Sequence, residues 1–187
     1  MAIPADIANA LYGAWRLARL DRGGLAFFDH GEAAFWRSFR AAFIAYPAFL
    51  LLLPLGPGDS GTTDWVRVLL VETIAYVIGW TAFPLVILPV TRILGRESLW
   101  LDFIIVYNWS QVLQYGAILA IIAVSLSGLA PPVLQGGLLY LAYLAVFAYE
   151  GFIARIVLNI SWPAAGMIVL IDFVLGRLIS VTAESLH

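Results

Sequence analysis

Residues 101–127 read LDFIIVYNWSQVLQYGAILAIIAVSLS, a stretch in which Asp102 is the one charged residue. A helix needs about 20 mostly apolar residues to cross the hydrocarbon core of a membrane, which is about 30 Å thick. Pro84 and Pro89 predict a kink or break in the run that precedes this stretch. With the runs on either side, the sequence predicts an all-α polytopic transmembrane helical bundle. Its five spans cover approximately residues 36–55, 65–94, 101–127, 133–157 and 161–181.

The composition of the whole chain agrees with a membrane location. Hydrophobic residues make up 63% of the sequence, the mean hydropathy is +0.94 and charged residues make up 12%, against roughly 25% in soluble domains. A water-soluble protein of this composition would expose more apolar surface than water tolerates. The short gaps between the runs predict antiparallel neighbours in one five-helix transmembrane domain, residues 33–187. A cytoplasmic amphipathic segment, residues 1–32, precedes it.

Within this N-terminal segment, residues 5–20 show the periodicity of an amphipathic helix. The apolar positions recur at helical spacing and are Ile7, Leu11, Trp15 and Ala18. A helix that also carries Trp15, Arg16 and Arg19 suits the membrane interface, where these three residues would act as anchors. The alternative is a helix packed on the cytoplasmic face of the protein itself.

The start of the first predicted span combines a helix cap with aromatic and basic residues. Asp29 and Glu32 have the spacing of a capping box, with Asp in place of the usual Ser or Thr. Trp36 belongs to an aromatic belt at the membrane surface, and Arg37 and Arg40 can reach the lipid headgroups. We therefore expect a helix to begin at Asp29, and Trp36, Arg37 and Arg40 to anchor it at the interface.

Arginine is distributed unevenly between the two predicted sides of the membrane. All ten basic residues are Arg, and eight fall before the first span or beside alternate loops: Arg16, Arg19, Arg22, Arg37, Arg40, Arg92, Arg96 and Arg155. Arg67 and Arg177 lie on the other side. Because cytoplasmic loops are enriched in Arg and Lys, we expect a cytoplasmic N-terminus and a periplasmic C-terminus. The absence of Lys beside abundant Arg, Ala and Gly favours a bacterial inner membrane protein.

Six ionisable residues fall inside the predicted spans, where charge is costly and is a sign of function. They form an inner and an outer layer and are Glu72, Asp102, Glu150, Arg155, Asp172 and Arg177. Each layer holds one Arg and two carboxylates. In the inner layer Arg155 could pair with Glu150 or Asp102, and in the outer layer Arg177 could pair with Asp172 or Glu72. These pairs could specify helix packing, form a proton or ion relay, or contact a lipid headgroup or partner subunit.

The third and fourth spans carry polar groups that could meet in a seam near the middle of the membrane. On the third span Asn108, Gln111 and Tyr115 share one face, and Gln114 flanks it. One face of the fourth span carries Tyr140, Tyr143, Phe147 and Glu150. Amide hydrogen bonds between helices contribute about 0.6–2 kcal/mol. The seam could therefore hold the helices together or line a cavity for a substrate.

The motifs of common enzymes are missing from the sequence. GxSxG, HExxH and P-loop patterns are absent. The chain has no Cys and two His, His30 and His187, which leaves little for thiolate, haem or His-based metal sites. No basic patch indicates nucleic acid. We therefore expect a protein without catalytic residues, metal or cofactor, and without a nucleic-acid partner.

The segments Gly24-Leu25-Ala26-Phe27-Phe28-Asp29 and Glu32-Ala33-Ala34-Phe35-Trp36-Arg37-Ser38-Phe39 resemble the openings of short bacterial Yip1-like membrane proteins. The order of a short cytoplasmic N-terminus and five closely spaced spans also resembles that family. Its eukaryotic members carry an Asp-Leu-Tyr-Gly-Pro motif, which is reduced here to Leu11-Tyr12-Gly13-Ala14. The resemblance implies a non-enzymatic membrane protein that acts through partners or membrane organisation.

Two functions are compatible with these features. The first is a scaffold or accessory subunit that works with membrane lipids and a protein partner or a second copy of itself. The second is a small oligomeric transporter or channel that uses the polar seam and the buried carboxylates. A scaffold predicts a dry, packed interior with apolar side faces, whereas a transporter predicts a continuous polar path.

Overall fold

The computed structural model describes residues 4–53, 64–127 and 131–186, and every regular element in these ranges is a helix. The N-terminal part contains α1 (Ala5–Ala18), the 3-10 helix η1 (Arg22–Phe27), α2 (Glu32–Ser38) and α3 (Arg40–Leu52). The longer helices are α4 (Trp65–Ile93), α5 (Trp100–Leu126), α6 (Pro132–Leu158) and α7 (Trp162–Glu184), with the short η3 (Glu97–Leu99) before α5.

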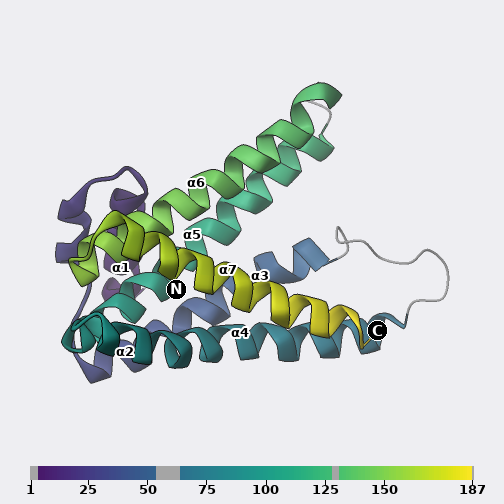
Figure 1. Ribbon diagram of the computed structural model, residues 1–187. Helices are drawn as coiled ribbons and strands as arrows, with labels where there is room; N and C mark the ends of the chain where they lie inside the picture. Colours follow the sequence, from purple (N-terminus) through teal and green to yellow (C-terminus); the bar gives the residue numbers. More distant parts are fainter. Residues whose placement is uncertain (1–3, 54–63, 128–130, 187) are drawn as a thin grey trace.

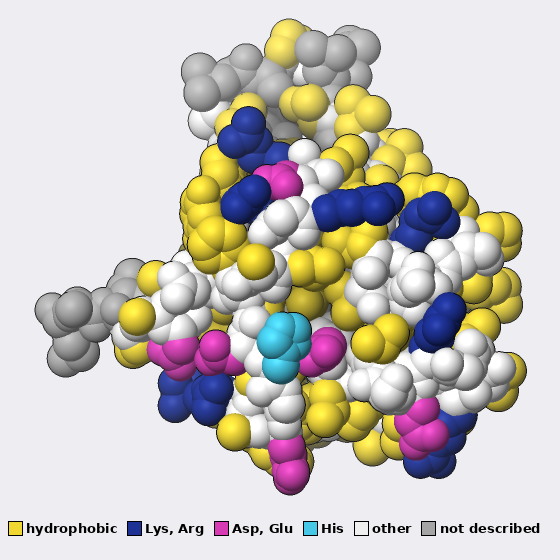
Figure 2. Space-filling view, turned by 90° about the vertical axis from the view of Figure 1, so that its left-hand side faces the viewer, with side chains coloured by type: hydrophobic (Ala, Val, Ile, Leu, Met, Phe, Trp, Pro, Cys, Tyr) yellow, Lys and Arg dark blue, Asp and Glu magenta, His cyan; other side chains and the backbone are white. Residues whose placement is uncertain are grey.

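The helices form two arms that meet at one end of the molecule (Figure 1). One arm contains α4 and α7, and the other is the α5–α6 hairpin, which diverges toward its tip. The joined end carries α1, η1 and α2, together with the α4–α5 and α6–α7 connections. Because eight of the ten Arg belong to these segments or flank them, we call it the Arg-rich end. Figure 2 views this end directly, and basic side chains are spread widely over it.

Four helical segments in the described part of the chain are long and apolar enough to cross a membrane. They are Trp65–Ile93, Glu97–Leu126, Gly137–Leu158 and Trp162–Glu184, and they correspond to the second to fifth predicted spans. The fourth of them begins after Ser161, whose side chain accepts a hydrogen bond from the Ala164 amide. The fold is therefore an all-helical one with several candidate membrane spans.

The first predicted span differs from the other four. The range 36–55 is not one continuous helix, because α2 ends at Ser38 and α3 begins at Arg40. The 13 residues of α3 extend about 20 Å at 1.5 Å per residue, which is shorter than the roughly 30 Å hydrocarbon core. Residues 54 and 55 lie outside the described part. α3 nevertheless runs away from the Arg-rich end (Figure 1), packs mainly against α5 and contacts α4 through the hydrogen bond from Tyr76 to the Ala42 carbonyl.

The core is concentrated at the Arg-rich end, with α5 at its centre. α5 packs against α1, α2, α3, α4 and α6, while α7 packs against α4 and α6. The largest fully buried apolar side chains come from four helices, α1, α4, α5 and α6, and are Leu17, Phe83, Ile87, Phe103, Ile104, Ile105, Ile153 and Leu158. Toward the tip of the hairpin, large apolar side chains such as Leu126, Tyr140 and Leu144 are exposed.

The predicted apolar face of the N-terminal helix is wrong in part. Its buried side is formed by small residues and one Leu: Ala10, Gly13, Ala14 and Leu17. Trp15 is 45% exposed and Ala18 is also exposed. The small side chains let α1 pack closely on α5, and the Tyr149 hydroxyl of α6 donates to the Ala14 carbonyl at 2.7 Å. This is the second of the two alternatives, a helix packed on the protein's own end.

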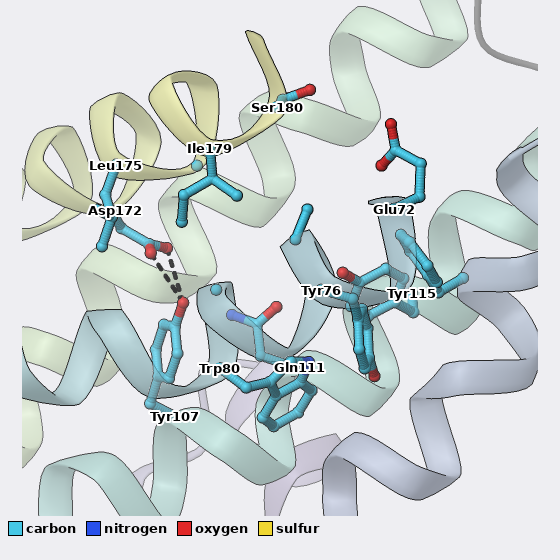
Figure 3. A pocket seen from close by; sticks show the side chains of 14 residues that line it. Glu72, Tyr76, Trp80, Tyr107, Gln111, Tyr115, Asp172, Leu175, Ile179 and Ser180 are labelled. Carbon is cyan, nitrogen blue, oxygen red and sulfur yellow. Dashed lines mark hydrogen bonds between the residues drawn. The ribbon is translucent and has the colours of Figure 1, made fainter. Parts of the chain in front are cut away.

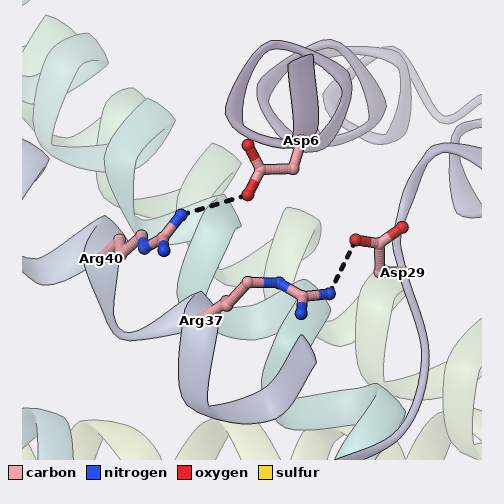
Figure 4. Close-up of polar contacts among 4 residues, drawn as sticks. All are labelled: Asp6, Asp29, Arg37 and Arg40. Atoms are coloured by element: carbon pink, nitrogen blue, oxygen red, sulfur yellow. Dashed lines mark hydrogen bonds and ion pairs between the residues drawn. The ribbon is translucent and has the colours of Figure 1, made fainter. Parts of the chain in front are cut away.

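The predicted capping box does not form. Gly31, with a φ of +84°, is the N-cap of α2, which begins at Glu32. Asp29 instead accepts a hydrogen bond from Arg37 at 3.0 Å, and Asp6 accepts one from Arg40 at 3.2 Å (Figure 4). These two ion pairs connect the N-terminal segment to α2 and α3, so the arginines contact protein carboxylates.

Helix α4 continues through both of its prolines. Pro84 and Pro89 lie inside the single helix Trp65–Ile93, so no break occurs where a kink or break was expected. Membrane-spanning helices tolerate proline because neighbouring groups satisfy freed backbone atoms. The indole N–H of Trp100 also donates to the Pro84 carbonyl at 3.0 Å, which connects the start of α5 to α4.

Candidate functional site

A cavity of about 320 Å³ lies among α4, α5 and α7, with Phe49 of α3 at its edge. Its volume is at the lower end of the roughly 300–1,000 Å³ usual for ligand sites. The remaining lining residues are Glu72, Ala75, Tyr76, Gly79, Trp80, Tyr107, Gln111, Tyr115, Asp172, Leu175, Gly176, Ile179 and Ser180. Carboxylates, aromatic rings and small residues therefore share one space inside the predicted membrane region.

Three stripes of residues at four-residue spacing supply most of the polar lining. The spacing from residue i to i+4 keeps side chains on one face of a helix. α4 contributes Glu72, Tyr76 and Trp80, α5 contributes Tyr107, Gln111 and Tyr115, and α7 contributes Asp172, Gly176 and Ser180. The three stripes face one another across the cavity (Figure 3).

At one end of the cavity, Tyr107 connects α5 to α7. Its hydroxyl donates to both carboxylate oxygens of Asp172, each at 2.9 Å. The Tyr107 ring stacks on Phe83 of α4, with 4.1 Å between the ring centroids. The stacking holds the ring in place, so that the hydroxyl is fixed toward Asp172.

Next to this contact, Gln111 connects α5 to α6. Its side-chain N–H donates to Glu150 Oε1 at 3.5 Å, the outer limit of a hydrogen bond. Glu150 is 9% exposed and interacts with Asp172. Two carboxyl groups from α6 and α7 are thus close to the two donors, Tyr107 and Gln111, that lie one turn apart on α5.

The other end of the cavity is lined by Glu72 and Ser180, on the same side in Figure 3. Between the two ends lie aromatic rings. The Tyr76 centroid is 5.9 Å from that of Trp80 and 6.2 Å from that of Tyr115. The Tyr76 hydroxyl donates to the Ala42 carbonyl of α3 at 2.7 Å, which fixes the ring in the cavity wall.

The predicted polar seam is present in part. Gln111 and Glu150 meet as expected, but Asn108 is 1% exposed and its amide donates to the Ser38 hydroxyl of α2 at 2.8 Å. Gln114 contacts Ser110 of its own helix at 3.3 Å. On α6, Tyr140 and Tyr143 are exposed instead of facing α5. The seam is narrower because α5 is buried on several sides at this level, so its polar residues point to different neighbours.

The predicted pairing of the arginines inside the spans is wrong. The Arg155 guanidinium lies 4.8 Å from the centre of the Trp162 ring and donates to the Ile160 carbonyl at 3.3 Å. Arg155 is in the last turn of α6, where free carbonyl groups attract cations. Arg177 is exposed and does not line the cavity. Among the described residues, neither arginine forms an ion pair with the carboxylates proposed for it.

Asp102 belongs to the Arg-rich end and is separate from the cavity. Its carboxylate lies 2.9 Å from His30 Nδ1, and both residues line a smaller cavity of about 130 Å³. The contact joins the first turn of α5 to the segment before α2. Asp102 is therefore a surface contact of the joined end.

The predicted interface anchors lie on the outside of the Arg-rich end. Trp36 is 65% exposed, and the Arg19 guanidinium lies 4.8 Å from the centre of the Trp15 ring. Arg16 donates to Asp21 at 2.6 Å. This hydrogen bond, with that from the Gly23 amide, lowers the pKa of Asp21 below its usual 3.8.

Sequence reasoning missed several residues of the cavity, chiefly Tyr76, Trp80 and Ser180. Tyr107 was likewise absent from the predicted polar face of the third span. The missing signal was the four-residue spacing that follows Glu72 on α4 and Asp172 on α7. In the part of the chain that the structure describes, no group of three or more His, Cys, Asp or Glu is arranged to hold a metal ion.

Comparison with known proteins identifies no relative of the chain. No protein-family model matches it, and no curated protein or solved structure shows significant similarity.

Proposed function

We propose that the protein is a multi-pass membrane protein that binds a small solute between α4, α5 and α7 and acts as a small carrier or channel. The observation that carries this proposal is the cavity of about 320 Å³ inside the helices that could span the membrane. A packing role alone would favour apolar residues at these positions, because buried ionisable groups are costly in lipid. Binding and passage of a solute, without chemical change, is the proposed activity.

The proposed orientation places the Arg-rich end in the cytoplasm of a bacterial cell and the far end of α7 on the periplasmic side. Eight Arg at one end support it through the positive-inside rule. The path of α3 away from that end supports five crossings (Figure 1). α3 is short, so this crossing requires locally thinner lipid or flanking residues that complete it. The exposed Tyr12 and Trp15 of α1 are proposed lipid contacts.

A transport assay tests the proposed activity. The purified full chain is reconstituted into vesicles, and a mixture of small charged and neutral solutes is added outside. Solutes that enter are identified by mass spectrometry. We expect at least one solute to accumulate above protein-free vesicles, and Gln111→Leu to lower its uptake roughly tenfold. Tyr140→Phe, on an exposed ring, is the control and should leave uptake unchanged. Equal uptake in all samples contradicts a carrier or channel.

The α5–α6 hairpin favours a second candidate, a scaffold or accessory subunit. Toward its tip the hairpin diverges from α4 and α7 (Figure 1), and Tyr140, Leu141 and Leu144 are 62–76% exposed. A partner helix or a second copy of the chain could pack there as readily as lipid. The Yip1-like relationship, which would imply such a role, is carried by the sequence resemblance alone.

Co-purification after extraction in mild detergent tests this second candidate. We expect a partner to be retained by the unaltered chain and lost from the double variant Leu141→Ala/Leu144→Ala. Met167→Ala/Leu170→Ala removes similar exposed side chains from α7 and should retain the partner. An unaltered chain that purifies as a monomer without any bound protein contradicts the scaffold, and so does equal retention of a partner by both double variants.

A further inference from the structure

We propose that the cavity takes a small organic cation, an ammonium compound with a short apolar body. This inference rests on the proposed function, because it names the class of solute for the same cavity. The volume of about 320 Å³ limits the solute to a small molecule. The argument has three parts: the charge of the lining, the position of the arginines, and the aromatic rings.

The lining of the cavity is negative. Glu72 and Asp172 belong to it, and no Arg, Lys or His is among the described residues that line it. Asp172 accepts hydrogen bonds from Tyr107, an uncharged donor. Glu150 adds a third carboxyl group behind Gln111. A carboxylate in a membrane-spanning region is stabilised when a positive charge comes close, and a cationic ligand supplies that charge.

The ion pairs among the described residues lie outside the cavity. The five ion pairs among the described residues involve Arg16, His30, Arg37, Arg40 and Arg92. All five belong to segments of the Arg-rich end. Asp172 is in none of these five pairs, and it accepts its two hydrogen bonds from the uncharged Tyr107 hydroxyl.

The aromatic rings favour an organic cation over a metal ion. Tyr76, Trp80 and Tyr115 lie between the two carboxylates of the lining (Figure 3). Ammonium groups are attracted to the faces of such rings by about 0.5–2 kcal/mol. Metal ions prefer a set of several oxygen, nitrogen or sulfur ligands, and no such group of side chains is found in the described residues.

Labelling of single cysteines tests the charge of the solute directly, because the chain contains no Cys. Ser180→Cys places a thiol in the cavity lining, and Ser185→Cys places one on an exposed position beyond it. Each purified protein reacts with a methanethiosulfonate carrying either trimethylammonium or sulfonate. At Ser180→Cys we expect a cation-to-anion rate ratio roughly tenfold above that at Ser185→Cys.

Competition and charge removal complete the test. Choline should slow the labelling of Ser180→Cys, whereas 3,3-dimethylbutan-1-ol, its uncharged isostere, should not. Asp172→Asn and Glu72→Gln, each added separately, should return the rate ratio to the Ser185→Cys value. Glu97→Gln removes a carboxylate from the Arg-rich end and should leave the ratio unchanged. The two cavity variants are independent of each other. Either variant that folds, as judged by its melting curve, is enough to show whether removing a cavity carboxylate lowers the rate ratio.

Two outcomes separate this inference from the proposed function. If both reagents label Ser180→Cys and the cation-to-anion rate ratio equals that at Ser185→Cys, the cavity is open to solutes but has no preference for cations. This result overturns the organic-cation inference and leaves the proposed carrier or channel function standing. If neither reagent labels Ser180→Cys while Ser185→Cys reacts, the cavity is closed to solutes and both proposals fail.

Discussion

Tyr107 is the residue on which the contact between α5 and α7 depends most directly. Its hydroxyl reaches both oxygens of Asp172, and its ring is stacked on Phe83. Tyr107→Phe keeps the ring and removes the donor. We expect a loss of about 1 kcal/mol in stability, since hydrogen bonds between membrane helices average about 0.6 and reach about 1.7 kcal/mol. A thermal melt in detergent should show a fall of roughly 3 °C.

Tyr140→Phe removes the same hydroxyl from a ring that is 76% exposed and serves as the control for this prediction. Its melting temperature should match that of the unaltered chain. Equal melting of all three proteins would show that the Tyr107 hydroxyl does not stabilise the helix pair.

Asn108 presents a different case, a buried amide that is only half satisfied. Its N–H donates to Ser38, but its side-chain oxygen has no hydrogen-bond partner among the described protein atoms. Ser38 itself donates to the Phe35 carbonyl, so it remains bonded if the amide is removed. We expect Asn108→Leu to change the free energy of unfolding by less than about 1 kcal/mol. The substitution loses the hydrogen bond to Ser38, but it also removes a buried acceptor that has no partner, and the two effects offset each other.

Asn108→Asp, nearly the same in shape, should instead cost roughly 2 kcal/mol or more, because it introduces a carboxyl group into a buried site. Melting curves of the two variants at neutral pH measure the difference. A large loss for Asn108→Leu and none for Asn108→Asp would mean that a polar group is required at this position.

At the scale of elements, α1 and η1 are joined by a close contact between two glycines. A Cβ on Gly24 would lie 2.6 Å from the Gly13 carbonyl oxygen, and a Cβ on Gly13 would lie 2.8 Å from the Gly24 oxygen. Backbone atoms cannot move aside as a flexible side chain can. We therefore expect Gly13→Ala and Gly24→Ala each to cost about 1–3 kcal/mol, and to speed proteolytic cleavage between α1 and α2.

Gly166→Ala is the matched control for these two variants. A Cβ at this α7 position meets nothing within 4 Å, and alanine is a better helix former than glycine by about 1 kcal/mol. The variant should melt at the same temperature as the unaltered chain or slightly higher. Comparable destabilisation by all three substitutions would mean that the α1–η1 contact has no special role.

At the scale of the whole molecule, the path of α3 decides the topology. α4 begins and α7 ends at the same end of their arm. With the N-terminal segment at the opposite end, the orientation that we propose implies that α3 crosses the membrane. We expect a fluorescent protein fused to the N-terminus to be active in a bacterial cytoplasm. Alkaline phosphatase fused after His187 should be active in the periplasm. An inactive phosphatase with an active C-terminal fluorescent fusion would give an even number of crossings and remove α3 from the spans.

Much of the architecture was predictable from the sequence, and the reason is physical. Hydropathy and Arg sidedness are sums over many residues, so the second to fifth runs were located within a few residues of α4, α5, α6 and α7. The capping of α7 by Ser161 is likewise local. The first run, 36–55, differs from its prediction because it contains a break between α2 and α3, next to the hydrogen bond from Asn108 of α5 to Ser38.

The pairing of polar side chains was decided by the tertiary structure. In lipid, a helix that is apolar on every side has no preferred face, so its rotation is set by packing against its neighbours. Sequence spacing alone could place Gln111 opposite Glu150, but not Tyr107 against Asp172 or Arg155 over Trp162. The sequence by itself thus determined helices long enough to span a membrane and the end that carries the arginines. Only the packing of α4, α5 and α7 brought three separate polar stripes together around one cavity.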